Sequence, residues 1–447
     1  MLSVECLRAA LWRLFFLITV THLLSLAVGS SSQAETLSFD QILNQAVAHS
    51  WDLRIREKEM GIRQYSLQEV RSLYYPTLSV RFDNQYVHDL TDGDNVISVG
   101  DQVVRVDGSS YQHSFTAGMN FLLYDFGARG LRLDNAKKDV RIAALNRNHT
   151  LLETKINVLD AFAQCLKIVR RHKTVEATLH HRQKIYTLTC RLQKSGSVGQ
   201  VEVNDAALAL AEAVTEQEKL KRNFEEALLN LAFFTGTAYD PQATTFAPLP
   251  VAPDPRHRPR PGRLAEIRAY DEEIRKLKAE REILKKSMFP TISLAANFRM
   301  LGSDPDSFST SLENLEGRDT SAALVARWEV FSGFRDVART NRLQKEVERL
   351  SLEKERRLHD RKREMNSAYQ RLLLAQAAVP DLKKRDRLLE RRAATDNRLA
   401  ENRITDRVSF LQREIDLMEQ KLAVTLEQME GRIAGLRLKF WQEGELP

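Results

Sequence analysis

The stretch Tyr75-Pro76-Thr77-Leu78-Ser79 ends one pattern and begins another, and it returns as Phe289-Pro290-Thr291-Ile292-Ser293. A second pair of matching motifs follows. It consists of Tyr124-Asp125-Phe126-Gly127 and, 207 positions later, Phe331-Ser332-Gly333-Phe334. The first pair differs by 214 positions, so only the connection between the two motifs has changed length. Long segments that keep their length while one connection varies indicate a duplicated unit with the variable part in a loop.

The first motif joins a helical pattern to a strand pattern. Upstream, Ser38 and Gln41 form a capping box, and apolar residues recur at helical spacing to about Tyr74. Pro76 ends that helix, and the apolar period then changes to two. The same alternation occurs in four segments, whose apolar positions include Leu78, Val80 and Phe82; Phe115, Ala117, Met119, Phe121 and Leu123; Ile292, Leu294, Ala296, Phe298 and Met300; Leu324, Ala326, Trp328 and Val330.

These four predicted strands are compatible with two structures. Strands of about 10 residues with one apolar and one polar face are typical of a transmembrane barrel wall, but also of a half-buried soluble sheet. Four strands cannot close a barrel, since small membrane barrels have about eight. Either the sheet packs on helices, or several chains pool their strands. The hairpin segments 88–110 and 301–319 are rich in Asp and Gly, which predicts exposed turns.

Long helical patterns follow each hairpin, over about residues 130–194 and 335–402. Each would be nearly 100 Å long at 1.5 Å per residue, and Pro380 is expected to bend the second. Short breaks follow at 195–199 and 402–405, after which helical pattern resumes, so each repeat ends in a helical hairpin with a tight tip. Residues 238–263 are rich in proline and predict an extended connector.

Composition and the N-terminus narrow the class of protein. Of 447 residues, 28% are charged, and the net charge of +7 comes from basic and acidic residues that are interleaved, so solvated helix faces are favoured over nucleic-acid binding. Arg8 and Arg13, an apolar run and Ser-Gln-Ala at 32–34 predict a secretory signal peptide over residues 1–34. The expected organisation is therefore a signal peptide, a first repeat over 35–237, the connector over 238–263 and a second repeat over 264–447.

Taken together, these features resemble the TolC family of outer-membrane channel-tunnel proteins. The resemblance covers essentially the whole mature chain and rests on the two Pro motifs with Tyr124-Asp125-Phe126-Gly127-Ala128-Arg129 and Trp328-Glu329-Val330-Phe331-Ser332-Gly333. It implies a mixed, mainly α fold in which four membrane strands per chain contribute to a trimeric 12-stranded barrel and long helices form a periplasmic α-barrel. It also implies a homotrimer in the bacterial outer membrane, in contact with outer-membrane lipid, that works with a periplasmic adaptor and an inner-membrane transporter.

The resemblance also assigns candidate site residues. The adaptor-docking tips would be Gly196 and Val198 in the first repeat and Arg403 and Thr405 in the second, where arginine replaces the family's tip glycine. The positions of a periplasmic constriction would be Ser409 and Gln412, whereas the first repeat offers the acidic residues Glu202 and Asp205. We therefore expect any acidic ring to come from the first repeat. Phe121 and Trp328, which correspond under the offset of 207, are expected at the inner membrane interface.

No catalytic chemistry is indicated. The sequence offers no set of nucleophile, base and orienting residue, no metal-ligand spacing around its histidines and no phosphate loop, so neither an enzyme nor a cofactor is expected. The expected function is a passive conduit for type I protein secretion or for efflux, and the stretch Asp125 to Arg129 resembles members that serve type I secretion. A non-transport periplasmic coiled-coil scaffold is the alternative, in which the strands would pack on helices.

Overall fold

The computed structural model describes residues 36–88, 96–99, 102–105, 110–251, 259–402 and 406–445, and the predicted signal peptide lies outside them. The described chain divides into two compact units. Of the described residues, the sheet unit contains those within 51–153, 259–368 and 440–445, and the helical unit contains those within 36–50, 154–251 and 369–439. Both units draw residues from both predicted repeats, because the two longest helices pass from one unit into the other.

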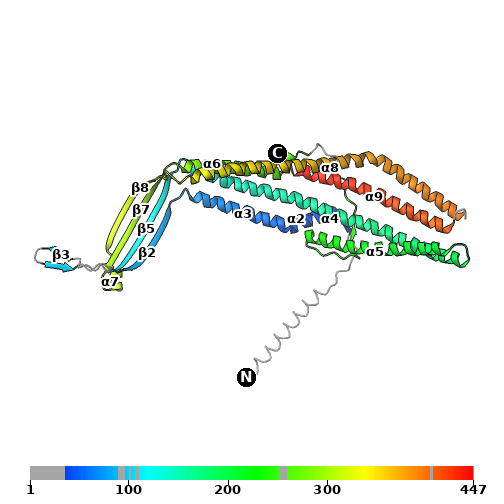
Figure 1. Ribbon diagram of the computed structural model, residues 1–447, viewed down its shortest axis with the longest axis horizontal. Helices are drawn as coiled ribbons and strands as arrows, with labels where there is room; N and C mark the ends of the chain where they lie inside the picture. The colour runs from blue at the N-terminus through cyan, green and yellow to red at the C-terminus, as the bar shows by residue number, and fades with distance from the viewer. Residues whose placement is uncertain are drawn as a thin grey trace, which may run out of the picture. The chain divides into compact units, whose positions relative to one another are not determined.

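The sheet unit is built on a four-stranded antiparallel sheet (Figure 1). Its strands lie in the order β2 (Thr77–Val87), β5 (Ser110–Tyr124), β7 (Thr291–Asp304) and β8 (Gly317–Arg327). Strands β3 (Val96–Val99) and β4 (Gln102–Arg105) form a separate two-stranded ribbon between β2 and β5. The pairing of β5 with β7 joins the two hairpins, so β2 and β8 are the edges of the sheet.

Each strand of the four-stranded sheet is preceded or followed in the sequence by a helix of the sheet unit. These helices are α3 (Trp51–Ser72), α6 (Ala265–Ser287), and the N-terminal parts of α4 (Ala128–Lys194) and α8 (Arg335–Glu401). The predicted stop at Pro76 is confirmed, because α3 ends four residues before it and β2 begins at the next residue. A 3-10 turn, η1 (Pro261–Arg263), precedes α6.

The helical unit is a layer of long helices. It contains α2 (Phe39–His49), α5 (Gln200–Thr235), most of α9 (Arg407–Glu443) and the C-terminal parts of α4 and α8, with β1 (Thr36–Leu37) paired to β6 (Thr245–Phe246). Ile185 of α4 packs with Leu411 and Ile415 of α9, and Ala206 of α5 contacts this cluster. Leu382 and Leu389 of α8 pack with α9 on its other side. These contacts leave α5 and α8 on the two flanks of the layer.

The long helices match in length. α4 and α8 have 67 residues each and begin 207 positions apart, so the predicted helical segments and their equal length are confirmed. Pro380 lies inside α8, which continues to Glu401, so this proline does not end the helix. Among the described residues, no helix combines the length and the apolar composition needed to cross a membrane.

The duplicated turn before each long helix contains two consecutive left-handed residues. They are Phe126 (φ 55°) and Gly127 (φ 84°) in the first repeat, and Gly333 (φ 63°) and Phe334 (φ 64°) in the second. The left-handed region is costly for residues other than glycine, by roughly 1–2 kcal/mol per residue. Each turn therefore has glycine, which adopts positive φ at little cost, at one of its two left-handed positions. The glycine is at the second position in the first repeat and at the first position in the second repeat.

One expectation for the hairpin ends is wrong. Residues 301–319 do not form only exposed turns, because α7 (Phe308–Glu313) is a short helix between β7 and β8 that packs back onto the sheet. The hydroxyl of Ser311, which is fully buried, donates to the carbonyl of Tyr111 at 2.8 Å. A Cβ added at Gly302 would stand 2.2 Å from the Ser311 carbonyl oxygen, so this glycine permits the close approach.

Candidate functional site

One face of the four-stranded sheet is apolar. Directly opposite residues in an antiparallel pair point to the same face, so the register identifies the members of each row. Leu78 pairs with Met119 and Val80 with Ala117, and the rows continue through Ala296 and Phe298 of β7. Leu78 and Val80 are 78% and 69% exposed in the single chain. A protein in water rarely exposes such a contiguous apolar surface, and the lipid-facing wall of a barrel requires one.

The opposite face of the same sheet is polar. Ser79, Gly118, Asn297 and Ser321 form one row across the four strands. Charged residues occupy the next row, and β2 and β8 are exposed along their whole length. Within the described residues, no layer of helices covers either face, apart from α7 at one end. The alternative in which the strands pack on helices is therefore excluded.

Aromatic residues mark both ends of the apolar face. Near the junction with the helices, Trp328 is 60% exposed and its indole N–H donates to the Met288 carbonyl at 2.9 Å. Phe121 pairs with Leu294 close to this end of the apolar face and is half-buried. At the other end, the rings of Tyr86 and Tyr111 lie 4.7 Å apart.

The spacing of these aromatic groups suits a bilayer. Thr291 to Asp304 of β7 covers about 43 Å at 3.3 Å per residue, or about 33 Å along the normal at a tilt of about 40°. The hydrocarbon core of a bilayer is about 30 Å thick. The positions of Phe121 and Trp328 are therefore compatible with the predicted interface role.

A polar pair interrupts the apolar face near its far end. Asn84 and His113 are opposite one another, and the His113 Nδ1 lies 2.5 Å from the Asn84 Oδ1. The His113 Nε2 lies 3.1 Å from the Phe308 carbonyl oxygen, and the Phe308 ring packs edge-on against the imidazole at 4.6 Å. His113 is only 1% exposed, so α7 shields a polar site that would otherwise face lipid.

The motif between β5 and α4 forms the junction of strand and helix. The Asp125 carboxylate accepts a hydrogen bond from the Arg129 backbone N–H at 2.6 Å and thereby caps α4. The Arg129 guanidinium donates to the carbonyl oxygens of Leu122 (2.8 Å) and Leu73 (3.2 Å) and lies over the Tyr74 ring at 4.5 Å. Both residues of the motif thus have local structural roles.

The tip of the first helical hairpin is a Schellman motif. Gly196 has φ +75°, its N–H donates to the Gln193 carbonyl at 2.8 Å, and the Ser197 N–H donates to the Leu192 carbonyl at 2.9 Å. Val198 follows, half-buried, before α5 begins. Residues 403–405 are outside the described residues, so the structure does not describe the predicted tip residues Arg403 and Thr405.

The candidate constriction residues lie on the first turns of two helices in the helical unit. Glu202 and Asp205 are exposed on α5, and Ser409 and Gln412 are on α9. Gln412 accepts a hydrogen bond from the Arg182 guanidinium of α4 at 2.8 Å, so its amide stabilises helix packing. The Ser409 backbone N–H donates to the Asp406 carboxylate at 3.1 Å, which identifies Asp406 as the cap of α9.

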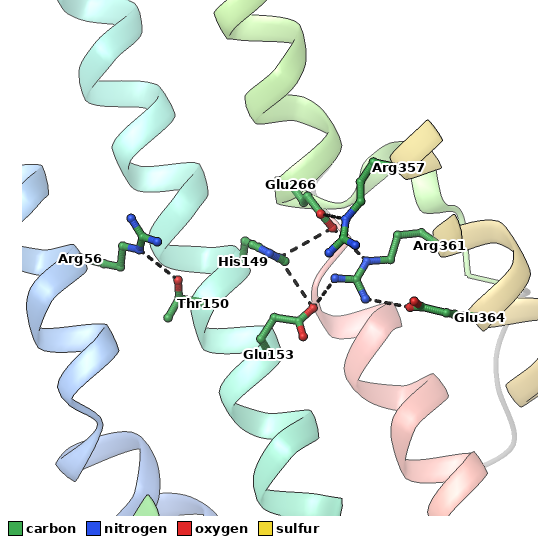
Figure 2. Close-up of polar contacts among 8 residues, drawn as sticks. All are labelled: Arg56, His149, Thr150, Glu153, Glu266, Arg357, Arg361 and Glu364. Atoms are coloured by element: carbon green, nitrogen blue, oxygen red, sulfur yellow. Dashed lines mark hydrogen bonds and ion pairs between the residues drawn. The ribbon is translucent and has the colours of Figure 1, made fainter. Parts of the chain in front are cut away.

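A buried ion cluster in the sheet unit was not predicted from the sequence (Figure 2). The Arg361 guanidinium of α8, 7% exposed, donates to Glu266 of α6 at 2.9 Å, to Glu153 of α4 at a shorter distance, and to Glu364 at 2.9 Å. Arg357 also contacts Glu266, and the His149 Nδ1 lies 3.9 Å from Glu266. The cluster connects α4, α6 and α8, and its two central groups, Arg361 and Glu266, are largely removed from water.

Burial and charge act in opposite directions on the pKa values in this cluster. Burial alone would raise the pKa of Glu266, but the guanidinium groups of Arg361 and Arg357 hold it below its ordinary value. Burial lowers the pKa of His149, an effect that the neighbouring carboxylates of Glu266 and Glu153 reduce without reversing. Both shifts favour an ionised Glu266 beside a neutral His149 at neutral pH.

Metal binding is not indicated by the described side chains. Among them, no group of three or more His, Cys, Asp and Glu residues could hold a metal ion. Cys165 is buried, which raises its pKa to about 12 and makes it a poor ligand or nucleophile at neutral pH. The candidate functional features of the fold are thus the two faces of the sheet, the tips of the helical hairpins and a structural ion cluster.

Comparisons with known proteins agree with this arrangement. Residues 42–237 match the family described as outer membrane efflux protein. The solved structure of CusC has 13% identity, a TM-score of 0.69, and an alignment over 93% of this chain and 95% of its own. VceC from Vibrio cholerae has 14% identity, a TM-score of 0.64 and coverage of 90% and 94%. CmeC from Campylobacter jejuni has 10% identity, a TM-score of 0.68 and coverage of 91% and 86%. A comparison with curated proteins gives no match.

Residues 42–237 match the outer membrane efflux protein family, and the chain has the fold of the TolC-like channels. The family match and the fold confirm the resemblance that the sequence motifs indicated. The matched family and the solved structures that share this fold are outer-membrane efflux proteins and channels.

Proposed function

We propose that three copies of this chain pool their strands into one 12-stranded barrel and their long helices into one periplasmic tunnel. The observation that carries this proposal is the sheet itself, with one apolar face, one polar face, and two exposed edge strands, β2 and β8. An unpaired edge cannot be left in a bilayer, because its backbone groups would have no partner. Closure by further copies satisfies both edges with the strands that the chain already has.

The assembled channel would be a passive conduit, with energy supplied by an inner-membrane transporter and connection through a periplasmic adaptor. α5 and α8 flank the helical layer, so they would meet their counterparts in neighbouring copies. The tips between α4 and α5 and between α8 and α9 would then face the adaptor. Gly196 and Val198 are our candidates for docking, together with Arg403 and Thr405 in the second tip.

The family description favours small molecules, expelled by efflux, as the cargo. Type I protein secretion is the second candidate, and it rests on the resemblance of the stretch from Asp125 to Arg129. Because Asp125 caps a helix and Arg129 binds backbone carbonyls, local folding alone accounts for these two residues. The stretch therefore gives weak support for one cargo over the other.

Expression in a bacterium that lacks its own channel of this class tests the proposal. We expect a heat-modifiable trimer in outer-membrane fractions, and export restored only when the cognate transporter and adaptor are present. A protein that remains monomeric in the outer membrane would contradict the trimer. Export by the channel alone would contradict the tripartite system. Secreted protein and expelled small molecules are measured in parallel, so the cargo is assigned in the same experiment.

Adaptor docking at the first tip is tested by cross-linking. Val198→Cys should form a cross-link to the adaptor in the periplasm, whereas a cysteine at Glu225, which is exposed on the first hairpin but far from the tip, should not. Equal cross-linking at both positions would argue against docking at the tip.

An acidic ring near the tips is proposed from Glu202 and Asp205 of α5. The variant Glu202→Gln/Asp205→Asn should lower cation preference in a conducting channel. Ser409→Glu, which adds a carboxylate at the exposed position of α9 that corresponds to Glu202, should raise it. Unchanged conductance and ion preference in the first variant would show that these carboxylates are ordinary solvated charges.

The same proposal includes removal of residues 1–34 as a signal peptide and a duplicated organisation of the mature chain. The two repeats would be residues 35–237 and 264–447, joined by the proline-rich connector over 238–263. Mass spectrometry of the protein from outer membranes should find Glu35 as the first residue. An N-terminus at Met1 in the outer membrane would contradict the cleavage.

A further inference from the structure

One row of side chains across the polar face of the sheet is rich in arginine. The register pairs Arg81 of β2 with Thr116 of β5, Thr116 with Arg299 of β7, and Arg299 with Asp319 of β8. Directly opposite residues share a face, so these four side chains stand at one level on the polar face. We call this set the arginine row. The neighbouring polar row, which contains Ser79 and Asn297, carries no charge.

The two guanidinium groups of the arginine row are available to solvent. Arg81 lies 3.9 Å from Asp83 on its own strand, at the limit of an ion pair, and the side chains are 77% and 54% exposed. Arg299 is exposed and makes no ion pair with any residue that the structure describes. A surface pair of this kind contributes little, so neither arginine is explained by a contribution to stability.

The spacing of the row suits an anion with several oxygen atoms. Neighbouring strands lie about 4.8 Å apart, so the Cα atoms of Arg81 and Arg299 are about 10 Å apart with the Thr116 hydroxyl between them. Two guanidinium groups and one hydroxyl thus offer hydrogen-bond donors from three adjacent strands. Guanidinium groups match carboxylate and phosphate oxygens in pairs, and their charge is permanent. Within the row, Asp319 is the one acidic member, so the net charge of the row is positive; Asp83 in the next polar row is the acidic residue near Arg81.

We propose that the arginine row is an anion-binding subsite inside the barrel, which favours the passage of solutes that carry carboxylate or phosphate groups. This inference rests on the proposed trimer, in which the polar face lines the lumen. A 12-stranded barrel is about 24 Å across at a tilt of about 40°, so the row lies within roughly one Debye length of the axis. Three copies place six guanidinium groups and three carboxylates in one band of the pore, which extends about 9 Å along the axis because the strands are tilted.

The test is the ion selectivity of the full-length trimer in a planar lipid bilayer under a roughly tenfold KCl gradient at low ionic strength. The double variant Arg81→Gln/Arg299→Gln should lower the ratio of chloride to potassium permeability by about threefold or more. Citrate added on the side to which the barrel opens should reduce the current of the unmodified channel. In the double variant, this reduction should require a severalfold higher citrate concentration.

Two further variants serve as controls. Arg318→Gln removes the same charge one residue from Asp319, but Arg318 pairs with Met300 and lies on the apolar face. We expect it to leave selectivity unchanged. Asp319→Asn removes the acidic member of the row, so it should raise the preference for anions. Because this variant shifts selectivity in the opposite direction, the inference stays testable even if the double variant does not fold.

The possible results separate this inference from the proposed function. Conduction with the selectivity of the unmodified channel in both Arg81→Gln/Arg299→Gln and Asp319→Asn would overturn the arginine row as a subsite and leave the channel intact. An equal shift in Arg318→Gln would overturn it as well, because the effect would not depend on the face. A correctly folded trimer without any conductance would overturn the channel, and the subsite with it.

Discussion

Replacement of Arg361 by glutamine is the change that should most strongly destabilise the junction of α4, α6 and α8. Arg361 is 7% exposed and donates to Glu266, whose side chain is 9% exposed, as well as to Glu153 and Glu364. Loss of one partner of a buried ion pair leaves an uncompensated charge and costs about 3–5 kcal/mol. Arg357 still contacts Glu266 in the variant, so we expect a value of about 3 kcal/mol, near the lower end.

The matched control is two residues away on the same helix. Arg363 is 74% exposed and lies 3.6 Å from Asp360, so Arg363→Gln removes an exposed pair and should cost about 0.5 kcal/mol or less. A second variant, Arg361→Gln/Glu266→Gln, also removes the stranded carboxylate. It should therefore recover part of the lost stability.

The assay is urea unfolding of the purified protein in detergent, followed by the circular dichroism of its helices. We expect Arg361→Gln to unfold at a clearly lower urea concentration than Arg363→Gln, with the double variant between them. If the free energies of unfolding of Arg361→Gln and Arg363→Gln differed by less than about 1 kcal/mol, the cluster would not be buried in the way described. A double variant less stable than Arg361→Gln would contradict the role of Glu266.

Three further predictions concern pH, the first tip and the strand-to-helix junction. Burial lowers the pKa of His149 in the folded protein. As pH falls below the unfolded pKa of about 6.5, His149 therefore takes up a proton more readily in the unfolded chain than in the folded protein. The folded state loses stability over this pH range. The urea midpoint should decrease as pH drops below this value, and His149→Gln should flatten the decrease; an unchanged slope would refute the assignment. Gly196→Ala should cost about 1 kcal/mol through its positive φ, whereas Ser195→Ala should cost less, and hydrogen exchange at Ser197 measures both. Asp125→Ala should lower the stability of α4 by about 1–2 kcal/mol and Asp125→Asn by less, since asparagine keeps an acceptor for the Arg129 N–H; equal thermal shifts would contradict the capping role.

Periodicity and spacing predicted the elements of this fold well. The change from helical spacing to period two at Pro76 and Pro290 marks the starts of β2 and β7, because proline ends a helix and the strand faces differ in polarity. The equal lengths of α4 and α8 follow from the offset of 207. These features are local or repeated, so a single sequence contains the information that specifies them.

Contacts between distant parts of the chain were not predictable in the same way. Glu266 and Arg361 belong to different helices, and each looks like an ordinary solvated charge within its own helical pattern. The helix α7 was missed because its six residues, Phe-Ser-Thr-Ser-Leu-Glu, are too few to show a clear period, and its burial depends on Gly302 and His113 of other strands. One local signal was available, since Ser307 precedes the helix and caps it.

The candidate site was predicted unevenly for the same reason. The capping role of Gly196 follows from a glycine after a long helical pattern, whereas the contact of the Gln412 amide with Arg182 joins two helices and has no local signal in the sequence. The arginine row needs the register of four strands, because Arg81 and Arg299 come from different repeats. Alternation within one strand assigns a residue to a face but not to a row.

The central claim is that one face of the sheet lines a water-filled pore and the other faces lipid. Ser321 and Ala322 are neighbours on β8, both exposed in the single chain, and their partners Asn297 and Ala296 lie on the polar and the apolar face. Each is replaced by cysteine in a variant that lacks the half-buried Cys190, and a membrane-impermeant maleimide is applied to intact outer membranes. We predict rapid labelling of Ser321→Cys and little labelling of Ala322→Cys. Equal labelling of the two would contradict the account.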